Sequence, residues 1–350
     1  MASEAMRSCR VVAPHQAEVC RGELPEVPPG WVLCRVAAMG ICGTDVEIYT
    51  GELPYLRTGA VRYPVVPGHE WVGRVAALGA GVTSLAEGDR VTGETHVGCG
   101  RCPECLAGRY NQCAALLRVG IGGLPGACAD YILLPEQALH RLPDEVPDEQ
   151  AILIEPSTVV HRALLRAEFA GGERVIIFGP GTLGLLGISL ARALGAAEVV
   201  LVGTRRERLE LGRRLGADRT VNLREEGAAL GKLAGWADVA LEASGSPEAF
   251  SAALAALRPG GRLSLVSLYR APLAGLDLNP LVARNLKVAG SLGSPGLWPQ
   301  TIRLWAAGRI RAEGLVTHRF DLERAPEALA VAAARSGGAI KVAVEMERRL

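Results

Sequence analysis

The stretch from residue 174 to residue 217 limits the fold of this 350-residue chain more than any other part of it. RVIIF is a short apolar run typical of a buried strand, and LLGISLARALGA has the spacing of an amphipathic helix. EVVLVG and RERLELGRRLGA repeat the strand and the helix. Strands and helices that alternate at this pace build a parallel sheet, because each parallel connection needs a crossover. We therefore expect a doubly wound parallel α/β sheet over residues 157–291.

A glycine-rich loop joins the first strand to its helix. Gly179, Gly181 and Gly184 form the pattern G-x-G-x-x-G. The first glycine allows the turn, the second lets the backbone approach a pyrophosphate, and the third lets helix and strand pack closely. The N-terminus of the helix would offer its free N–H groups to the phosphates. We predict a dinucleotide site here that includes Thr182 and Leu183; a glycine-rich turn without a ligand is the alternative.

The end of the second strand indicates which dinucleotide is preferred. An acidic residue usually stands there to bind the ribose 2′-hydroxyl of NAD. In this chain the strand ends at Gly203, followed by Thr204, Arg205 and Arg206. A small residue leaves room for a 2′-phosphate, and either arginine could pair with it. We expect NADP to be favoured over NAD, the alternative being that both arginines are solvated.

Four cysteines lie within the sixteen residues GCGRCPECLAGRYNQC, namely Cys99, Cys102, Cys105 and Cys113. Four thiolates suit tetrahedral zinc. An iron–sulfur cluster is the rival, but its common bacterial run ends C-x3-C-P, which this spacing does not match. Four cysteines close the coordination shell and leave no position for water or substrate. The cluster is therefore expected to hold a structural zinc rather than a catalytic one.

Composition excludes several classes of function. The formal net charge is +1, without the basic face of a nucleic-acid binder. No apolar run approaches the roughly 18 residues that a membrane span needs. We expect no secretory signal, since the first fifteen residues contain no apolar h-region. Nine cysteines, an odd number, do not suit a disulfide framework. We expect a cytoplasmic protein that acts on a small molecule, with no nucleic-acid or membrane partner.

The remaining segments predict a second domain. Residues 1–156 have short strands, many glycines and prolines and few helical repeats, as in an irregular β-barrel. The structural zinc would organise a lobe at about residues 93–115. Residues 292–350 end in the strand-like AIKVAVE and are expected to return to the β domain. The dinucleotide domain at 157–291 would then be inserted between two parts of the β domain.

Several short motifs occur in a specific order along the chain. GICGTD, GHE, GDRV, the cysteine run, EP and GPGTLG follow one another over most of the sequence. In this order they resemble the zinc-dependent medium-chain dehydrogenase/reductase family, nearest to the sorbitol, threonine and other polyol dehydrogenases. The resemblance implies a GroES-like catalytic domain, with the zinc lobe, and a Rossmann domain.

The resemblance also implies a second, catalytic zinc, which makes two zinc ions per chain. Cys42, His69 and Glu155 would be its ligands. Glu70 would bind this zinc directly or through a water. Asp45 would orient the His69 imidazole, because a ligating histidine needs a partner that fixes its tautomer.

Further roles follow from the same resemblance. Thr44, two residues after the cysteine ligand, would accept the proton of the alcohol. Relatives often carry a histidine where this chain has Glu47, so this carboxylate, or ribose hydroxyls and water, would pass the proton on. Ser244 and Gly245 would contact the cofactor at the end of a later strand.

The sequence thus predicts a zinc-dependent oxidoreductase. It would transfer a hydride between a secondary alcohol of a polyol or sugar-like substrate and NAD(P). An aminocyclitol or amino alcohol is the alternative substrate, and a family member that binds NADPH without turnover is the alternative of another class. A homodimer or homotetramer is expected.

The other histidines and two aromatic residues have weaker signals. We expect His96, His161 and His318 to be structural or solvated. Trp71 and Tyr49 would either line the pocket or pack in the core.

Overall fold

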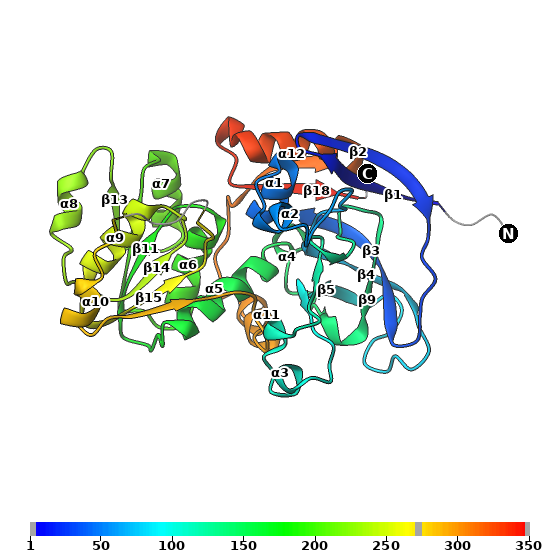
Figure 1. The fold of residues 1–350 in the computed structure, drawn as a ribbon, viewed down its shortest axis with the longest axis horizontal. Coiled ribbons are helices and arrows are strands. Elements are labelled where there is room, and N and C mark those ends of the chain that lie inside the picture. Colours follow the sequence, from blue (N-terminus) through cyan, green and yellow to red (C-terminus); the bar gives the residue numbers. More distant parts are fainter. Residues whose placement is uncertain (1–4, 270–274, 347–350) are drawn as a thin grey trace. The chain divides into compact units, whose positions relative to one another are not determined.

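The computed structural model describes residues 5–269 and 275–346. The chain divides into two compact units (Figure 1). One unit runs to Glu155 and resumes at Val316, and the other is Pro156–Leu315. The return to the first unit thus occurs at Val316 and not at the expected residue 292.

The later return has a physical reason in the packing of α11 (Trp298–Ala306). His161 Nδ1 lies 2.9 Å from Thr301 Oγ1, and the Trp305 indole donates a hydrogen bond to Ser157 Oγ at 3.2 Å. These buried contacts fasten α11 to α5 (Ile154–Arg166). The segment after residue 291 therefore completes the core of the second unit.

The second unit is built on a six-stranded parallel sheet with the order β13-β12-β11-β14-β15-β16. Its strands are β11 (Arg174–Phe178), β12 (Glu198–Gly203), β13 (Arg219–Asn222), β14 (Ala237–Glu242), β15 (Leu257–Leu265) and β16 (Lys287–Gly290). The helices besides α5 and α11 are α6 (Thr182–Ala193), α7 (Arg206–Arg214), α8 (Gly227–Gly231), α9 (Pro247–Ala256) and α10 (Asn279–Ala283). The strand order reverses direction beside β11, as in doubly wound dinucleotide-binding sheets. The predicted parallel α/β sheet is confirmed.

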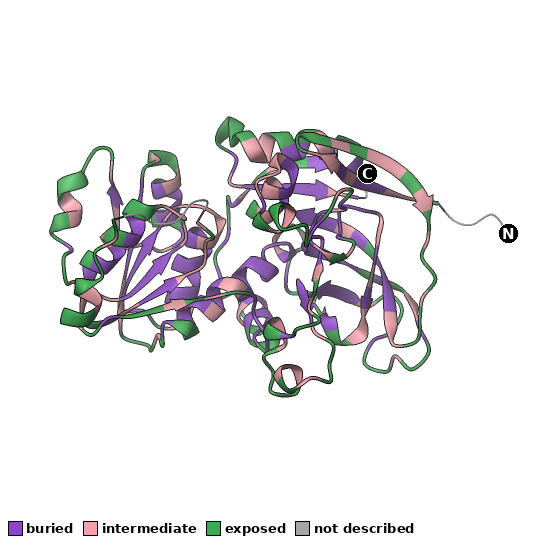
Figure 2. Cartoon of the chain, viewed as in Figure 1, coloured by how far each residue is buried: buried purple, intermediate pink, exposed green. Residues whose placement is uncertain are grey.

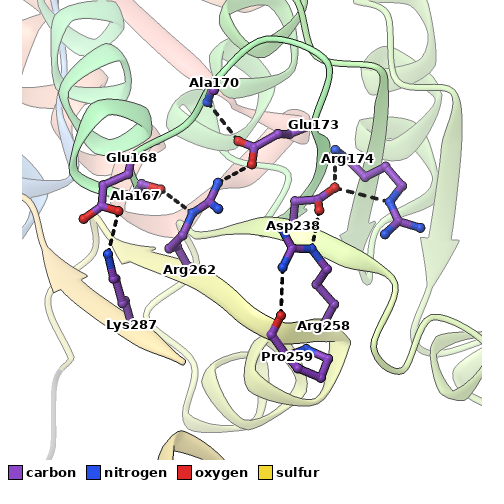
Figure 3. A network of polar contacts seen from close by, with 10 residues as sticks. All are labelled: Ala167, Glu168, Ala170, Glu173, Arg174, Asp238, Arg258, Pro259, Arg262 and Lys287. Atoms are coloured by element: carbon purple, nitrogen blue, oxygen red, sulfur yellow. Dashed lines mark hydrogen bonds and ion pairs between the residues drawn. The ribbon is translucent and has the colours of Figure 1, made fainter. Parts of the chain in front are cut away.

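Charged side chains connect neighbouring strands of this sheet (Figure 3). Asp238 accepts hydrogen bonds from the backbone N–H of Arg174 at 2.8 Å and from Arg258 Nε at 2.5 Å. Arg262 pairs with Glu173 at 2.5 Å. Asp238 and Arg174 lie at the amino ends of β14 and β11, so the carboxyl ends of these strands remain available for a ligand.

The first unit is mainly antiparallel. A seven-stranded sheet has the order β10-β5-β4-β3-β18-β17, with β9 also paired to β3, and two smaller sheets are β1-β2 and β6-β7-β8. The strands are β1 (Ala5–Ala13), β2 (Gln16–Glu23), β3 (Trp31–Gly40), β4 (Glu70–Leu78), β5 (Arg90–Gly93), β6 (His96–Val97), β7 (Leu117–Val119), β8 (Gly123–Leu124), β9 (Tyr131–Pro135), β10 (Leu139–Arg141), β17 (Val316–Asp321) and β18 (Lys341–Glu345). The helices are α1 (Gly43–Thr50), α2 (Pro54–Arg57), α3 (Pro103–Leu106), α4 (Asp148–Ala151) and α12 (Ala325–Ala334), with 3-10 turns at Tyr110–Gln112, Glu136–Ala138, Leu322–Arg324 and Ser336–Gly338. The C-terminal strand β18, red in Figure 1, pairs with the blue β3 from the other end of the chain.

Each unit has its own apolar core. The central strands β11, β12 and β14 of the parallel sheet are buried along most of their length (Figure 2). In the first unit Trp71 is fully buried and Tyr49 is 8% exposed, and both belong to the core cluster. Core packing is thus the role that the structure gives these two aromatic residues.

Within the described ranges, no helix combines the length and apolarity needed to cross a bilayer.

Candidate active site

Three side chains with metal-binding atoms meet in the first unit. The ligand atoms of Cys42, His69 and Glu70 all lie within 4.8 Å of one another. Cys42 directly precedes α1, while His69 and Glu70 stand at the start of β4. The antiparallel register of β3 and β4 places Gly40 opposite Glu70, which brings the chain entering α1 beside the GHE segment. We call these three residues the metal group.

Two glycines make room for the metal group. A Cβ on Gly40 would lie 2.6 Å from Glu70 Oε2, so any side chain there would displace the carboxylate. Gly68 has a φ of +104°, a conformation that favours glycine. A Cβ on Gly68 would also lie 2.6 Å from Met39 Sδ. The close packing of the site therefore requires the first glycine of GICGTD and the glycine of GHE.

Asp45 holds the two ligand-bearing segments together. Its fully buried carboxylate accepts hydrogen bonds from the backbone N–H of Cys42 at 2.8 Å and of Gly68 at 3.0 Å. The distance from Asp45 Oδ1 to His69 Nδ1 is 3.7 Å, too long for a hydrogen bond. Asp45 thus acts on the backbone on both sides of the site, and its effect on the imidazole is electrostatic.

The charges around the metal group favour a bound cation. Burial and the negative charge of Glu70 raise the pKa of the Cys42 thiol. Burial lowers the pKa of His69, but the charges of Asp45 and Cys42 outweigh burial and raise this pKa well above its ordinary value. These shifts mean that the site disfavours the Cys42 thiolate and favours the protonated His69, so added positive charge would be stabilised there. A divalent metal ion would supply that positive charge. Thiolate, imidazole and carboxylate are also the donors that zinc accepts.

Glu155, from the EP motif, is close to the metal group but not part of it by the same 4.8 Å measure. Its carboxylate is buried in the first turn of α5, where Thr95 Oγ1 donates to Oε1 at 2.6 Å. Burial raises its pKa to about 7, with opposing effects from the charges of His69 and Glu70. The carboxylate is therefore near enough to interact electrostatically with both residues.

Lys341 is a residue of this site that sequence reasoning missed. Its Nζ pairs with Glu70 Oε2 and donates a hydrogen bond to the Ile41 carbonyl at 3.0 Å. The two charged side chains are only 3% and 2% exposed. The available signal was a single lysine inside the apolar strand AIKVAVE, since lysine is almost never fully buried without a partner.

The residues predicted to handle the proton lie on α1. Thr44 and Glu47 are both half-buried, in the helix that starts directly after Cys42. His96, expected to be structural or solvated, is buried at the start of β6. Burial, followed by the positive charges of His69 and Arg118, lowers the pKa of His96 to about 4. This imidazole is therefore neutral at physiological pH and lies within electrostatic range of the metal group.

The four-cysteine cluster forms a second candidate metal site. The sulfur atoms of Cys99, Cys102, Cys105 and Cys113 all lie within 4.8 Å of one another. Backbone N–H groups lower the pKa of Cys99 to about 6, whereas burial and the other thiols raise that of Cys105 to about 12. A Cβ on Gly98 would lie 2.6 Å from the Cys105 sulfur. The loop is thus folded closely around four converging sulfurs, the donor set of a closed zinc site.

The glycines of the dinucleotide loop have three different environments. Gly179 has a φ of +99° at the turn. A Cβ on Gly181 would meet no atom within 4 Å, which leaves the space that a pyrophosphate needs. A Cβ on Gly184 would lie 1.9 Å from the Gly179 carbonyl oxygen, because helix and strand are in close contact there. Thr182 and Leu183 stand in the first turn of α6, and the N-terminus of a helix is a favourable position for an anion.

The carboxyl end of β12 has no acidic side chain. A Cβ on Gly203 would lie 2.5 Å from Pro180 Cγ, so packing against the glycine-rich loop requires a glycine here. Thr204 is exposed, and Arg205 is the N-cap residue of α7. Arg206 is 72% exposed and lies 3.8 Å from Glu225. Among the described residues Arg205 has no ion-pair partner, which leaves its guanidinium available to a phosphate.

Ser244 and Gly245 follow β14 in a loop held by a buried acid. The carboxylate of Glu242, which ends β14, accepts hydrogen bonds from the backbone N–H of Ser244 at 2.7 Å and of Gly245 at 3.1 Å. Tyr269 donates to the same carboxylate at 2.8 Å. This loop lies at the carboxyl edge of the sheet, where doubly wound folds bind their ligands.

Comparison with known proteins connects these sites to a family. Residues 28–144 match the family model of the alcohol dehydrogenase GroES-like domain, and residues 182–307 match that of the zinc-binding dehydrogenases. The L-threonine 3-dehydrogenase of Chelativorans sp. (strain BNC1) is 38% identical over 334 residues, which are 93% of this chain and 94% of that protein.

Solved structures agree with this assignment. A zinc-binding dehydrogenase from Sinorhizobium meliloti 1021 bound to NADP has a TM-score of 0.90 and 29% identity, covering 98% of this chain and 99% of that one. Galactitol-1-phosphate dehydrogenase from Escherichia coli has a TM-score of 0.87 and 30% identity, covering 97% and 99%. The chain therefore belongs to the zinc-dependent medium-chain dehydrogenase family, in the branch of the polyol and threonine dehydrogenases.

Proposed function

We propose that this dehydrogenase oxidises a secondary alcohol of a polyol or sugar-like substrate with NADP, at a zinc ion held by Cys42, His69 and Glu155. The observation that carries the proposal is the buried metal group, whose donors and charges suit a divalent cation. Glu70 would bind the zinc directly or through a water when it is not paired with Lys341.

When bound, zinc supplies a Lewis acid that lowers the pKa of the substrate hydroxyl, and the nicotinamide supplies the hydride acceptor. The chain's own residues would place the alcohol and move its proton. Thr44, on the first turn of α1, would accept the hydroxyl proton through its side-chain oxygen. Glu47, one turn further along α1, would pass the proton towards solvent. Asp45 would keep both ligand-bearing segments in place through their backbone amides.

The remaining sites have supporting roles in this proposal. Cys99, Cys102, Cys105 and Cys113 would hold a structural zinc, which gives two zinc ions per chain. The glycine-rich loop, with Ser244 and Gly245, would bind the dinucleotide. Arg205, with Arg206, would bind the 2′-phosphate that distinguishes NADP from NAD. We further propose a homodimer or homotetramer in the cytoplasm.

A second class of substrate is supported by the relatives. The L-threonine 3-dehydrogenases act on an amino alcohol, and they match more than nine-tenths of this chain. Galactitol 1-phosphate, named for the Escherichia coli structure, is a polyol derivative. An amino alcohol such as L-threonine is therefore the second candidate beside the polyols.

Metal analysis and a substrate screen test the proposal. We expect two zinc ions per purified chain, one of which is lost in Cys42→Ser together with alcohol oxidation. The screen would follow reduction of NADP and of NAD in the presence of polyols, sugar alcohols, aminocyclitols and amino alcohols. One zinc per chain and no reduction with any alcohol would contradict the proposal and favour a member that binds NADPH without turnover.

A further inference from the structure

Arg118, on β7, lies opposite a histidine that is within electrostatic range of the metal group, and none of the steps above uses it. β7 runs antiparallel to β6, and Arg118 is directly opposite His96. Opposed residues on paired strands point to the same face, with Cβ atoms about 4.5–5.5 Å apart. After burial, His69 and Arg118 are the groups that lower the pKa of His96, so both positive charges lie near this imidazole.

Hydrogen bonds also connect β7, through Thr95, to Glu155, the predicted glutamate ligand. The Val119 N–H donates a hydrogen bond to the Thr95 carbonyl at 2.9 Å. The Thr95 hydroxyl in turn donates to Glu155 Oε1 at 2.6 Å. The strand that carries Arg118 is therefore hydrogen-bonded to the segment of Thr95, the residue that contacts Glu155.

The guanidinium of Arg118 is held in place but not neutralised. Its central carbon lies 5.1 Å from the centroid of the Tyr55 ring, a cation–π contact that fixes the flat face. Its Nε is buried and has no hydrogen-bond partner among the described residues. The two acids of the metal site have other partners, because Glu70 pairs with Lys341 and Glu155 accepts a hydrogen bond from Thr95.

An arginine in this state is suited to bind an anion. A guanidinium presents its N–H groups as a planar fork that matches the oxygens of a carboxylate or a phosphate. The Arg118 guanidinium has no acidic partner among the described residues, and an anionic ligand would supply one. The Tyr55 ring covers one face and Nε is buried, so a ligand would bind at the terminal nitrogens.

We propose that Arg118 binds a carboxylate or phosphate group of the substrate and so selects alcohols that carry an anionic group. This inference rests on the proposed function, because it assigns the substrate to the same site. Arg118 would be a specificity-determining residue that makes no contribution to hydride transfer itself. Its effect would therefore fall on KM for anionic alcohols and leave kcat for neutral alcohols nearly unchanged.

The test compares anionic and neutral alcohols in the zinc-loaded enzyme. The substrates are L-threonine for the carboxylate, galactitol 1-phosphate for the phosphate, and galactitol and 2,3-butanediol as neutral alcohols. In Arg118→Gln we expect KM for the preferred anionic alcohol to rise about 10- to 100-fold, the loss of a charge-assisted hydrogen bond. The kcat/KM for the neutral alcohols should change less than about 3-fold. Arg118→Lys, which keeps the charge but not the fork, should give an intermediate KM.

A matched control is Arg62→Gln, which removes one exposed positive charge from the same unit. It should leave KM for every alcohol unchanged, and thermal unfolding of each variant shows whether it is folded. Equal effects of Arg118→Gln on anionic and neutral alcohols, or turnover by the wild type of neutral alcohols alone, would overturn the inference while leaving the proposed function intact.

Calorimetric titration separates the inference from catalysis. Binding of L-threonine or galactitol 1-phosphate to the wild type, weakened at least 10-fold in Arg118→Gln, would support the inference even if no alcohol is oxidised. Such a result without turnover would contradict the proposed function alone. Unchanged binding in the variant would overturn the assignment of Arg118.

Discussion

Replacing Lys341 with methionine removes one member of the buried ion pair beside the metal group. The Lys341 and Glu70 side chains are 3% and 2% exposed, so water cannot replace the lost cation. Removing one partner of a buried pair typically costs about 3–5 kcal/mol, because the remaining charge is left uncompensated. We expect a loss of unfolding free energy in this range for the zinc-depleted protein. The loss should be smaller in the zinc-loaded protein, where the metal ion supplies positive charge beside Glu70.

Urea unfolding of a double-mutant cycle measures the interaction. The cycle comprises Lys341→Met, Glu70→Gln and the double variant, which buries no unpaired charge. The double variant should therefore be more stable than the sum of the two single effects predicts, by at least about 2 kcal/mol.

A surface pair provides the control. Lys287 and Glu168 are separated by 2.7 Å but are 65% and 60% exposed. Their coupling, measured with Lys287→Met and Glu168→Gln, should stay below about 1 kcal/mol because solvent screens the charges. A coupling energy for Lys341 and Glu70 no larger than that of the surface pair would refute this reasoning.

Four further predictions concern the other sites. Cys105→Ser should lose one zinc per chain and unfold at a lower temperature, while the folded fraction keeps its alcohol oxidation; loss of the chemical step with the catalytic zinc still bound would contradict the structural role. Arg205→Ala should weaken NADP binding and leave NAD binding unchanged in a fluorescence titration, and equal NADP affinity would remove this arginine from the site. Glu47→Gln should shift the pH profile of kcat without abolishing activity, and an unaltered profile would exclude Glu47 from the proton path. His96 has a pKa of about 4 in the folded chain, against an ordinary value of 6.5. Between these two pH values the unfolded chain binds more protons than the folded chain, so the stability falls as the pH falls. From pH 7 to pH 5 this effect amounts to about 2 kcal/mol, and urea unfolding of His96→Asn should show a pH dependence smaller by that amount.

The local sequence contained most of the information about the second unit. The run from RVIIF to RERLELGRRLGA specifies strand, loop and helix through patterns that span few residues. The three loop glycines have separate geometries: Gly179 has a positive φ, Gly181 faces open space, and Gly184 packs against the Gly179 carbonyl. Likewise, four cysteines within sixteen residues need only a tight loop to converge.

Some expectations from the sequence were incomplete for physical reasons. The return to the first unit at Val316 depends on the packing of α11 against α5, which no local pattern reveals. Gly203 stays a predicted cofactor contact, and the structure adds a packing role against Pro180 that the sequence did not reveal. Asp45 was expected to orient the imidazole, and the structure adds that its carboxylate accepts hydrogen bonds from two backbone amides.

The sequence by itself predicted the parallel sheet, the glycine-rich loop and the cysteine cluster, because each has a pattern that can be recognised within a short stretch of the chain. Only the tertiary structure decided the surroundings of the metal group. The pairing of β3 with β4 and with β18 brings Cys42, Glu70 and Lys341 together from distant parts of the chain. The pairing of β6 with β7 places Arg118 opposite His96. Charged residues that strand pairing brings together produce no recognisable spacing pattern in the sequence. Their interaction depends on burial and on distance in space, and neither is encoded in their separation along the chain.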